Sequence, residues 1–80
     1  MADQPEFDRL RQICSTRLEA FIAETRKTEL AMQQLTLPVS LAASQQFASQ
    51  RNTEVVAFEN YIWATVRLSD FLQQHVYIVN

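Results

Sequence analysis

Apolar residues in the first half of the chain recur every three or four positions, which is the spacing of one face of an α-helix. The pattern is densest near the N-terminus and thinner toward the middle of the chain, and most intervening positions are polar or charged. The spacing predicts a helix over about residues 4–36. Its apolar face comprises Phe7, Leu10, Ile13, Cys14, Leu18, Phe21, Ile22, Leu30, Met32 and Leu35.

Local signals mark the start of this first helix. Asp3 and Glu6 have the spacing of a capping box, in which each side chain accepts a hydrogen bond from a free backbone N–H. Pro5 falls in the first turn, where its missing N–H removes no hydrogen bond. We therefore expect the helix to begin at about residue 4.

Pro38 marks the end of the first helix. A proline disfavours the α conformation at the preceding residue and cannot donate a backbone hydrogen bond. We expect a turn at about residues 37–40. Either Thr36 or Ser40 can accept the free N–H groups at the start of the next helix, and the sequence does not choose between them.

A seven-residue repeat runs through the second half of the chain and predicts a second helix over about residues 41–77. The polar run at 49–53 could cap a new helix, so a kink is possible there. One set of repeating positions comprises Leu41, Ala48, Val55, Ile62, Ser69 and Val76, and the other comprises Ser44, Arg51, Phe58, Thr65, Leu72 and Val79.

Two long helices joined by a short turn lie antiparallel, so the chain is predicted to be an all-α helical hairpin. With the turn centred on Pro38, the numbers of facing residues sum to about 76. This register places Phe21 opposite Val55 and brings Arg51 near two acidic residues of the first helix. The predicted hairpin core consists of Leu10, Cys14, Leu18, Phe21, Val55, Phe58, Ile62 and Leu72.

The second helix carries more apolar residues than one neighbouring helix can cover, which indicates a contact with another chain. We expect Trp63 to anchor this contact, because aromatic residues dominate the energetics of many interfaces. The alternative is that Trp63 packs within the chain, under a bent N-terminal segment or under a folded-back tail at 76–79, whose role stays open. The predicted interface consists of Val56, Tyr61, Trp63, Leu68 and Phe71.

Composition favours one small domain, over residues 1–80, that associates with a second subunit. The chain has 80 residues, 48% of them hydrophobic, a formal net charge of −2 and no glycine, so turns and caps that need a positive φ are scarce. A domain of this size buries only about 60% of the surface that its unfolded chain exposes. We therefore expect a homodimer that forms a four-helix bundle, in a parallel or an antiparallel arrangement.

Candidate chemistry is sparse. Cys14 and His75 are the only residues of their kinds, and the predicted register places Cys14 opposite Ile62, far from His75. The glutamates do not form the Glu-x-x-His motifs of a di-iron bundle. We expect no catalytic residue, no metal and no cofactor. A small helical enzyme or anionic-ligand binder, which would need arginines to converge at the bundle centre, is the remaining catalytic alternative.

Charge and hydropathy indicate which kinds of partner and compartment to expect. Seven basic and nine acidic residues are interspersed, so there is no basic stripe of the kind that binds nucleic acid. Glu59, Arg67 and Asp70 interrupt the most hydrophobic segment, so we expect no membrane-spanning helix. The polar N-terminal residues do not form a signal peptide, and a lone cysteine suits a reducing compartment, so we expect a cytoplasmic protein.

These observations predict a small non-catalytic protein interaction module, such as an adaptor, a regulator or a chaperone-like subunit, that acts through an apolar face of the second helix. The alternative is a monomer that binds a foreign amphipathic helix. Small type III secretion chaperones are similar in size and in hairpin design, although no residue motif carries this likeness.

Overall fold

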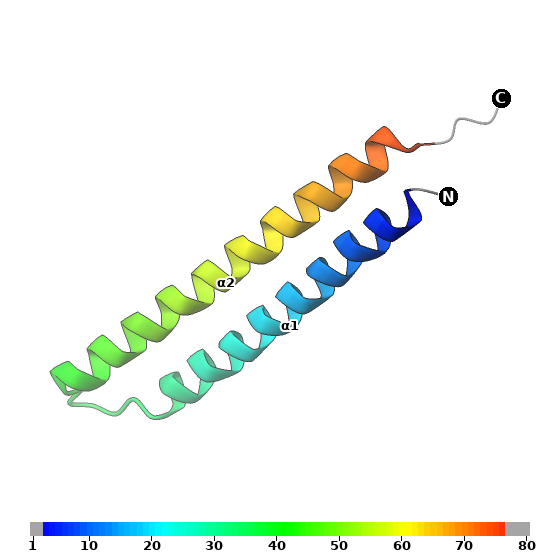
Figure 1. Ribbon diagram of the computed structural model, residues 1–80. Helices are drawn as coiled ribbons and strands as arrows, with labels where there is room; N and C mark the ends of the chain where they lie inside the picture. Colours follow the sequence, from blue (N-terminus) through cyan, green and yellow to red (C-terminus); the bar gives the residue numbers. More distant parts are fainter. Residues whose placement is uncertain (1–2, 77–80) are drawn as a thin grey trace.

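The computed structural model describes residues 3–76 as two long helices, α1 (Gln4–Gln33) and α2 (Leu41–Gln74), joined by a turn (Figure 1). The two helices lie side by side, and the described ends of the chain meet at the same end of the hairpin. The predicted all-α hairpin is confirmed, and no strand occurs in the described part of the chain. The predicted contribution of residues 77–79 lies outside the described residues.

Helix α1 begins at Gln4, as its sequence signals predict, but the expected capping box does not form. The side chain of Asp3 makes no capping hydrogen bond, and its Oδ2 lies 3.1 Å from Nε2 of His75 at the end of α2. Glu6 instead pairs with Arg9, with Oε1 and Nη2 2.7 Å apart. The prediction was wrong because both carboxylates have cationic or hydrogen-bonding partners that compete with the backbone N–H groups.

The turn is longer than predicted, because α1 ends at Gln33 and not at residue 36. The N–H of Leu35 donates to the carbonyl of Met32 at 3.1 Å, which tightens the chain before it leaves the helix. Ser40 caps α2, since its Oγ accepts a hydrogen bond from the N–H of Ala43 at 3.1 Å. Of the two candidate caps in the sequence, the structure therefore selects Ser40.

Helix α2 continues without a break through residues 49–53. Within this polar run, the hydroxyl of Thr53 donates to the carbonyl of Ser49 at 3.1 Å, which is a bond to the preceding turn of the same helix. The Thr53 hydroxyl therefore has its hydrogen-bond partner within the existing helix and does not cap a new one. No kink forms at the place where the sequence made one possible.

The helices pair close to the predicted register. The rings of Phe7 and Phe71 have centroids 6.2 Å apart, and those of Phe21 and Phe58 are 5.1 Å apart. The residue numbers of these pairs sum to 78 and 79, against a predicted 76. The offset is within one helical turn. It changes the partner of Phe21 from Val55 to Phe58.

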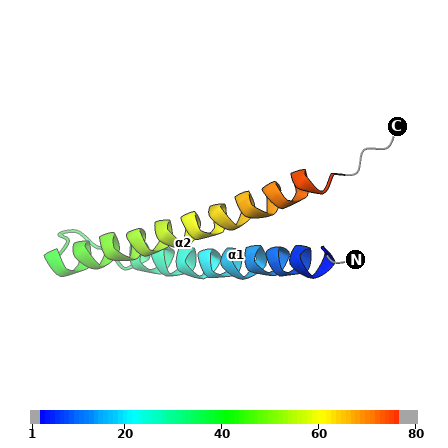
Figure 2. The ribbon, with the colours of Figure 1, turned by 45° about the horizontal axis from the view of Figure 1, so that its top comes forward.

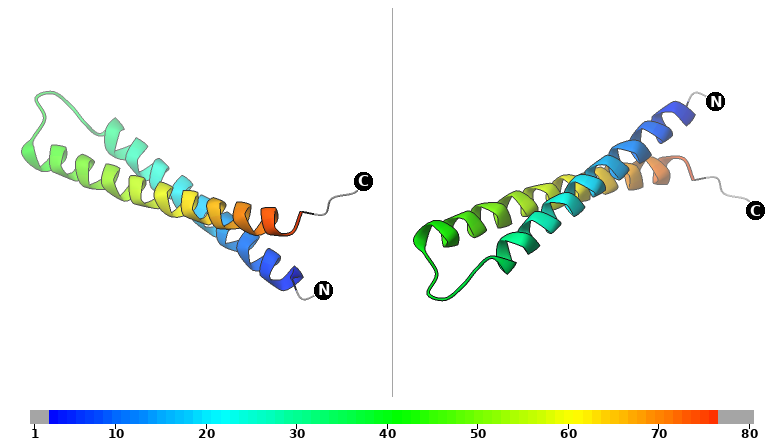
Figure 3. Two further views of the ribbon diagram at one scale, coloured as in Figure 1. Left: turned by 90° about the horizontal axis from the view of Figure 1, so that it is seen from above. Right: turned by 90° about the horizontal axis from the view of Figure 1, so that it is seen from below.

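The molecule is a thin rod, with principal extents of 65 × 20 × 15 Å. Figures 2 and 3 show that α2 is inclined to α1, so that the two ribbons cross when they are seen from above or below. The radius of gyration is 18.6 Å, whereas a compact domain of this length has about 12 Å. Among residues 3–76, only Leu10 and Ala64 are buried, with exposed fractions of 8% and 2%.

Candidate interaction surface

The contact between the helices follows one stripe of residues on each helix, which we call the inner stripe. Its members recur every three or four positions and are buried or half-buried. On α1 the inner stripe comprises Phe7, Leu10, Cys14, Arg17, Phe21, Glu24 and Thr28. On α2 it comprises Phe47, Gln50, Glu54, Ala57, Tyr61, Ala64, Leu68 and Phe71.

The predicted hairpin core lies only partly on this stripe. Leu10 is buried, and Cys14, Phe21 and Val55 are half-buried. Four other predicted core residues are exposed, namely Leu18, Phe58, Ile62 and Leu72. On α2 the predicted core positions are displaced by one residue from the inner stripe, which is about 100° around the helix. Phe58 still reaches the contact from its edge, where its ring packs on Phe21.

The predicted interface of α2 divides between two locations. Phe71 packs on Phe7, and Tyr61 and Leu68 lie half-buried on the inner stripe, so these three residues belong to the contact within the hairpin. Val56 and Trp63 are exposed, with exposed fractions of 55% and 65%. Within the described chain, Trp63 is therefore not covered by the N-terminal segment.

Small side chains explain which stripe faces α1. Ala57 and Ala64 are seven residues apart on the inner stripe, and alanine allows two helix backbones to approach closely. At this level Nη1 of Arg17 donates across the contact to the backbone carbonyl of Asn60, at 3.3 Å. The spacing of the two alanines in the sequence indicates which stripe of α2 faces α1. The prediction instead followed the large apolar residues, which lie on the neighbouring stripe.

Two groups of apolar residues lie beside the inner stripe near the middle of the helices. One is the lateral face, which consists of the exposed residues Leu18 and Ile22 from α1, the exposed residues Phe58 and Ile62 from α2, and the half-buried Val55 of α2. Each of these residues directly follows an inner-stripe residue, and in an antiparallel pair of right-handed helices such positions lie on the same side of both helices.

The second surface is the outer face of α2, which consists of Val56 and Trp63. These residues are seven positions apart, so they lie on one side of the helix, two turns from each other. Their side chains point away from both α1 and the lateral face, because they precede inner-stripe positions by one residue.

A polar cluster joins the helices toward the turn. Nε2 of Gln50 donates to Oε2 of Glu24 at 2.9 Å and to the backbone carbonyl of the same residue at 3.2 Å. Nζ of Lys27 lies 3.2 Å from Oε1 of Glu24. The hydrogen bond from Gln50, followed by the interaction with Lys27, lowers the pKa of Glu24 from its ordinary value of 4.5.

The predicted contact between Arg51 and acids of α1 is not made. Nη1 of Arg51 lies 3.2 Å from Oε1 of Glu54 on its own helix, and Gln50 takes the place opposite Glu24. Gln50 replaces Arg51 in this contact because the stripe of α2 that faces α1 lies one residue before the predicted stripe. The side chain of Arg51 is therefore exposed to the solvent.

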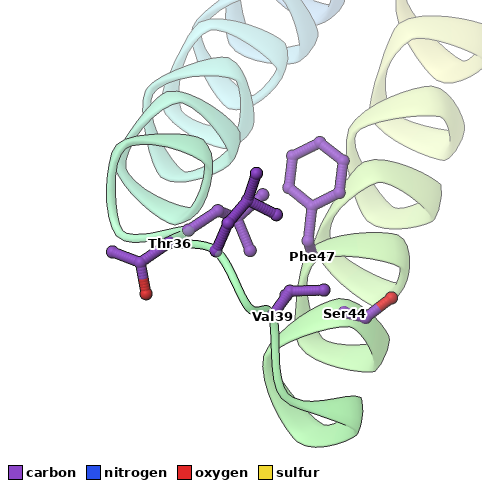
Figure 4. A pocket seen from close by; sticks show the side chains of 6 residues that line it. Thr36, Val39, Ser44 and Phe47 are labelled. Carbon is purple, nitrogen blue, oxygen red and sulfur yellow. The ribbon is translucent and has the colours of Figure 1, made fainter.

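A shallow hollow of about 280 Å³ lies between the turn and α2 (Figure 4). Phe47 and Ser44 of α2 and Thr36 and Val39 of the turn border it, and Leu35 and Leu37 complete its lining. Its only polar side chains are the hydroxyls of Thr36 and Ser44, and it carries no charged group. The walls contain no histidine, cysteine or carboxylate, so neither hydroxyl has an activating base among the lining residues.

His75 and Cys14, the only histidine and the only cysteine of the sequence, lie at different levels of the hairpin. In residues 3–76, no group of three His, Cys, Asp or Glu side chains could hold a metal ion. Nδ1 of His75 lies 2.7 Å from the carbonyl of Phe71, and the His75 ring stacks on the Phe71 ring, with centroids 4.1 Å apart. His75 therefore packs at the open end of the hairpin, far from Cys14 near the middle of α1.

Comparisons with protein family models, with curated proteins and with solved structures find no match for this chain. Neither of the two described helices has the length and hydropathy required to cross a membrane. A functional argument therefore depends on the exposed surface of the hairpin itself.

Proposed function

We propose that this chain is a small non-catalytic protein interaction module that associates with a helical protein surface through the apolar side of α2. The observation that carries the proposal is that α2 exposes large apolar residues on two sides that α1 leaves uncovered. On the outer face Trp63 and Val56 are more than half exposed, and on the lateral face Phe58 and Ile62 are 44% and 40% exposed. Exposed apolar clusters on small proteins usually mark binding sites for other proteins.

The accessible surface supports the same proposal. The hairpin exposes 6534 Å², whereas a compact monomer of this mass exposes about 5,000 Å². The difference is about 1,500 Å², and a standard protein interface covers about 800 Å² on each partner. One partner of ordinary size would therefore cover about half of this excess surface.

Self-association is the first case to test. We expect light scattering of the purified chain, measured across a dilution series, to give about twice the chain mass of 9.3 kDa at micromolar concentrations. The mass should fall toward that of one chain on dilution. A mass of 9.3 kDa at every concentration, with helical circular dichroism retained, would contradict self-association.

Binding of a foreign amphipathic helix is the second candidate, and the outer face favours it. Val56 and Trp63 are two turns apart on one side of α2, a spacing that can hold the apolar stripe of one added helix. In this case the Trp63 fluorescence maximum should shift to shorter wavelength when the partner helix binds. An unchanged spectrum in a complex of known stoichiometry would exclude the outer face as its site.

A further inference from the structure

The lateral face lies at the midpoint of the rod. Leu18 and Ile22 occupy the centre of α1, which spans residues 4–33, and Phe58 and Ile62 lie near the centre of α2, which spans residues 41–74. A two-fold symmetric contact requires that the same patch on both subunits meet at the axis. A central apolar patch on a rod satisfies this requirement while both rods remain fully overlapped.

On α1, the stripe that contains Leu18 and Ile22 extends to Arg11 in one direction and to Glu29 in the other. The residues along this stripe are complementary to those of a second copy that runs antiparallel. Leu18 and Ile22 are equally distant from position 20, and so are Arg11 and Glu29 at the two ends. Antiparallel pairing about position 20 therefore sets Leu18 against Ile22 of the partner subunit. The same pairing sets Arg11 against Glu29 of the partner subunit.

The α2 side has its own centre at nearly the same height. Phe58 and Ile62 are equally distant from position 60, and the contact of Phe21 with Phe58 puts position 20 level with about position 59. The two centres differ by about one residue, which is about 1.5 Å along a helix. One two-fold axis, perpendicular to the rod, can therefore serve both helices.

The partner of Arg11 differs between this axis and the other face-to-face arrangement. A two-fold axis along the rod would stack α1 on α2 of the partner subunit, and the observed register would set Arg11 near positions 66–68. Arg67 lies off the lateral face because it precedes the inner-stripe residue Leu68, and the lateral-face residues at this height, Thr65 and Ser69, give Arg11 no acidic partner. The perpendicular axis instead opposes Arg11 to a glutamate at each end of the interface, and such complementarity fixes orientation.

We propose that a second copy of this chain docks on the lateral face with its rod antiparallel to the first, so that Leu18 and Ile22 meet at a two-fold axis and Arg11 pairs with Glu29 of the partner subunit. This inference rests on the proposed interaction function and specifies its partner and its geometry. The product is a four-helix bundle in which each helix neighbours an antiparallel copy of itself. The outer face, with Trp63, stays accessible in this dimer.

A charge-swap series tests the arrangement by sedimentation equilibrium at low ionic strength. Arg11→Glu and Glu29→Arg should each raise the dimer dissociation constant by about tenfold, because each change makes like charges face each other. The double variant should return it close to the wild-type value. Among residues 3–76 of one chain, Arg11 contacts only residues near it, Asp8 at 3.9 Å and the Phe7 ring at 5.1 Å, so the rescue by Glu29→Arg reports contact between chains.

Covalent trapping gives a second readout that does not depend on charge. In a Cys14→Ser background, a chain with both Ser15→Cys and Thr25→Cys should oxidise to a covalent dimer, because these positions are also equally distant from position 20. Within one helix they are ten residues, or about 15 Å, apart and cannot form a disulfide. The chains with only one of the two new cysteines are the controls and should stay non-covalent.

Apolar variants separate the lateral face from the outer face. Ile22→Asp places a charge at the axis and should leave a helical monomer, whereas Trp63→Ala should leave the dimer intact. A dimer that the charge swaps and Ile22→Asp do not weaken would overturn the antiparallel lateral contact but leave the interaction function standing. A helical monomer in the wild type at all concentrations would overturn this dimer and the self-association case together.

Discussion

At the scale of single residues, the contact between the helices is apolar at one end and polar toward the turn. Phe7, Leu10 and Ala64 pack where the termini meet, whereas Glu24 and Gln50 form the hydrogen-bonded link nearer the turn. The exposed ion pairs along each helix, such as the one between Glu6 and Arg9, contribute little because water and salt screen them. The link between Glu24 and Gln50 joins the two helices and should therefore affect hairpin stability directly.

The lowered pKa of Glu24 predicts a pH-dependent contribution to stability. A carboxylate whose pKa is lower in the folded chain stabilises the fold above its unfolded pKa of about 4.5, and this contribution is lost as the pH falls through the folded pKa. Glu24→Gln should therefore lower the free energy of unfolding at pH 7. At about pH 3 it should differ little from the wild type.

Urea unfolding, followed by circular dichroism at one fixed chain concentration, measures this difference. Glu59→Gln, on the solvent side of α2, is the matched control. Some pH dependence should remain in Glu24→Gln, because the hydrogen bond from Arg9 also lowers the pKa of Glu6. An equal loss of stability between pH 7 and pH 3 in wild type and Glu24→Gln would contradict the assigned role.

At the scale of the elements, α2 carries two adjacent stripes whose members recur every three or four residues. One contains Ala57, Ala64 and Phe71 and faces α1, and the other contains Phe58 and Ile62 and forms part of the lateral face. A helix inside a four-helix bundle needs two such stripes, because it has a neighbour on each of two sides.

The start of α2 depends on one local hydrogen bond, from the Ala43 N–H to Ser40. The cap at Ser40 provides a prediction for α2. Ser40→Ala should lower the free energy of unfolding by about 1 kcal/mol, because the N–H of Ala43 loses its acceptor at the helix start. Thr36→Ala is the matched control and should change stability by less than about 0.5 kcal/mol, because Thr36 lies exposed in the turn. Equal effects of the two substitutions, measured by urea unfolding, would argue against Ser40 as the cap.

At the scale of the whole molecule, the hairpin is a rod with very little interior. A chain that buries only Leu10 and Ala64 among its described residues has few apolar contacts to oppose the conformational entropy of two long helices. Association along the lateral face would enclose Phe58, Ile62 and their partners between four helices. The inferred dimer therefore combines folding and assembly, and its stability should rise with chain concentration.

The length of the particle distinguishes a fully overlapped dimer from an end-to-end one. With the two-fold axis at the midpoint, the dimer should keep the long extent of a single hairpin, which is 65 Å, while its mass doubles. Small-angle X-ray scattering at concentrations where light scattering shows a dimer gives this maximum dimension. A dimension close to two hairpin lengths would show that the subunits associate through their ends.

Much of the fold follows from the sequence because its signals are local. The spacing of apolar residues predicted both helices, Pro38 located the turn, and the short connection required an antiparallel pair. The errors arose where groups distant in the chain compete, as when His75 draws the side chain of Asp3 away from the start of α1. Such competition is visible only after the two ends of the hairpin have been brought together.

The sequence by itself therefore determined the all-α class, the two helices, the turn and a register correct to within one turn, because each depends on neighbouring residues or on chain length. Only the tertiary structure decided which stripe of α2 faces α1. Two stripes one residue apart have the same spacing and similar apolar content, so periodicity does not rank them. The choice depends on how closely the backbones can approach, which Ala57 and Ala64 allow, and it leaves Phe58, Ile62 and Trp63 exposed for other contacts.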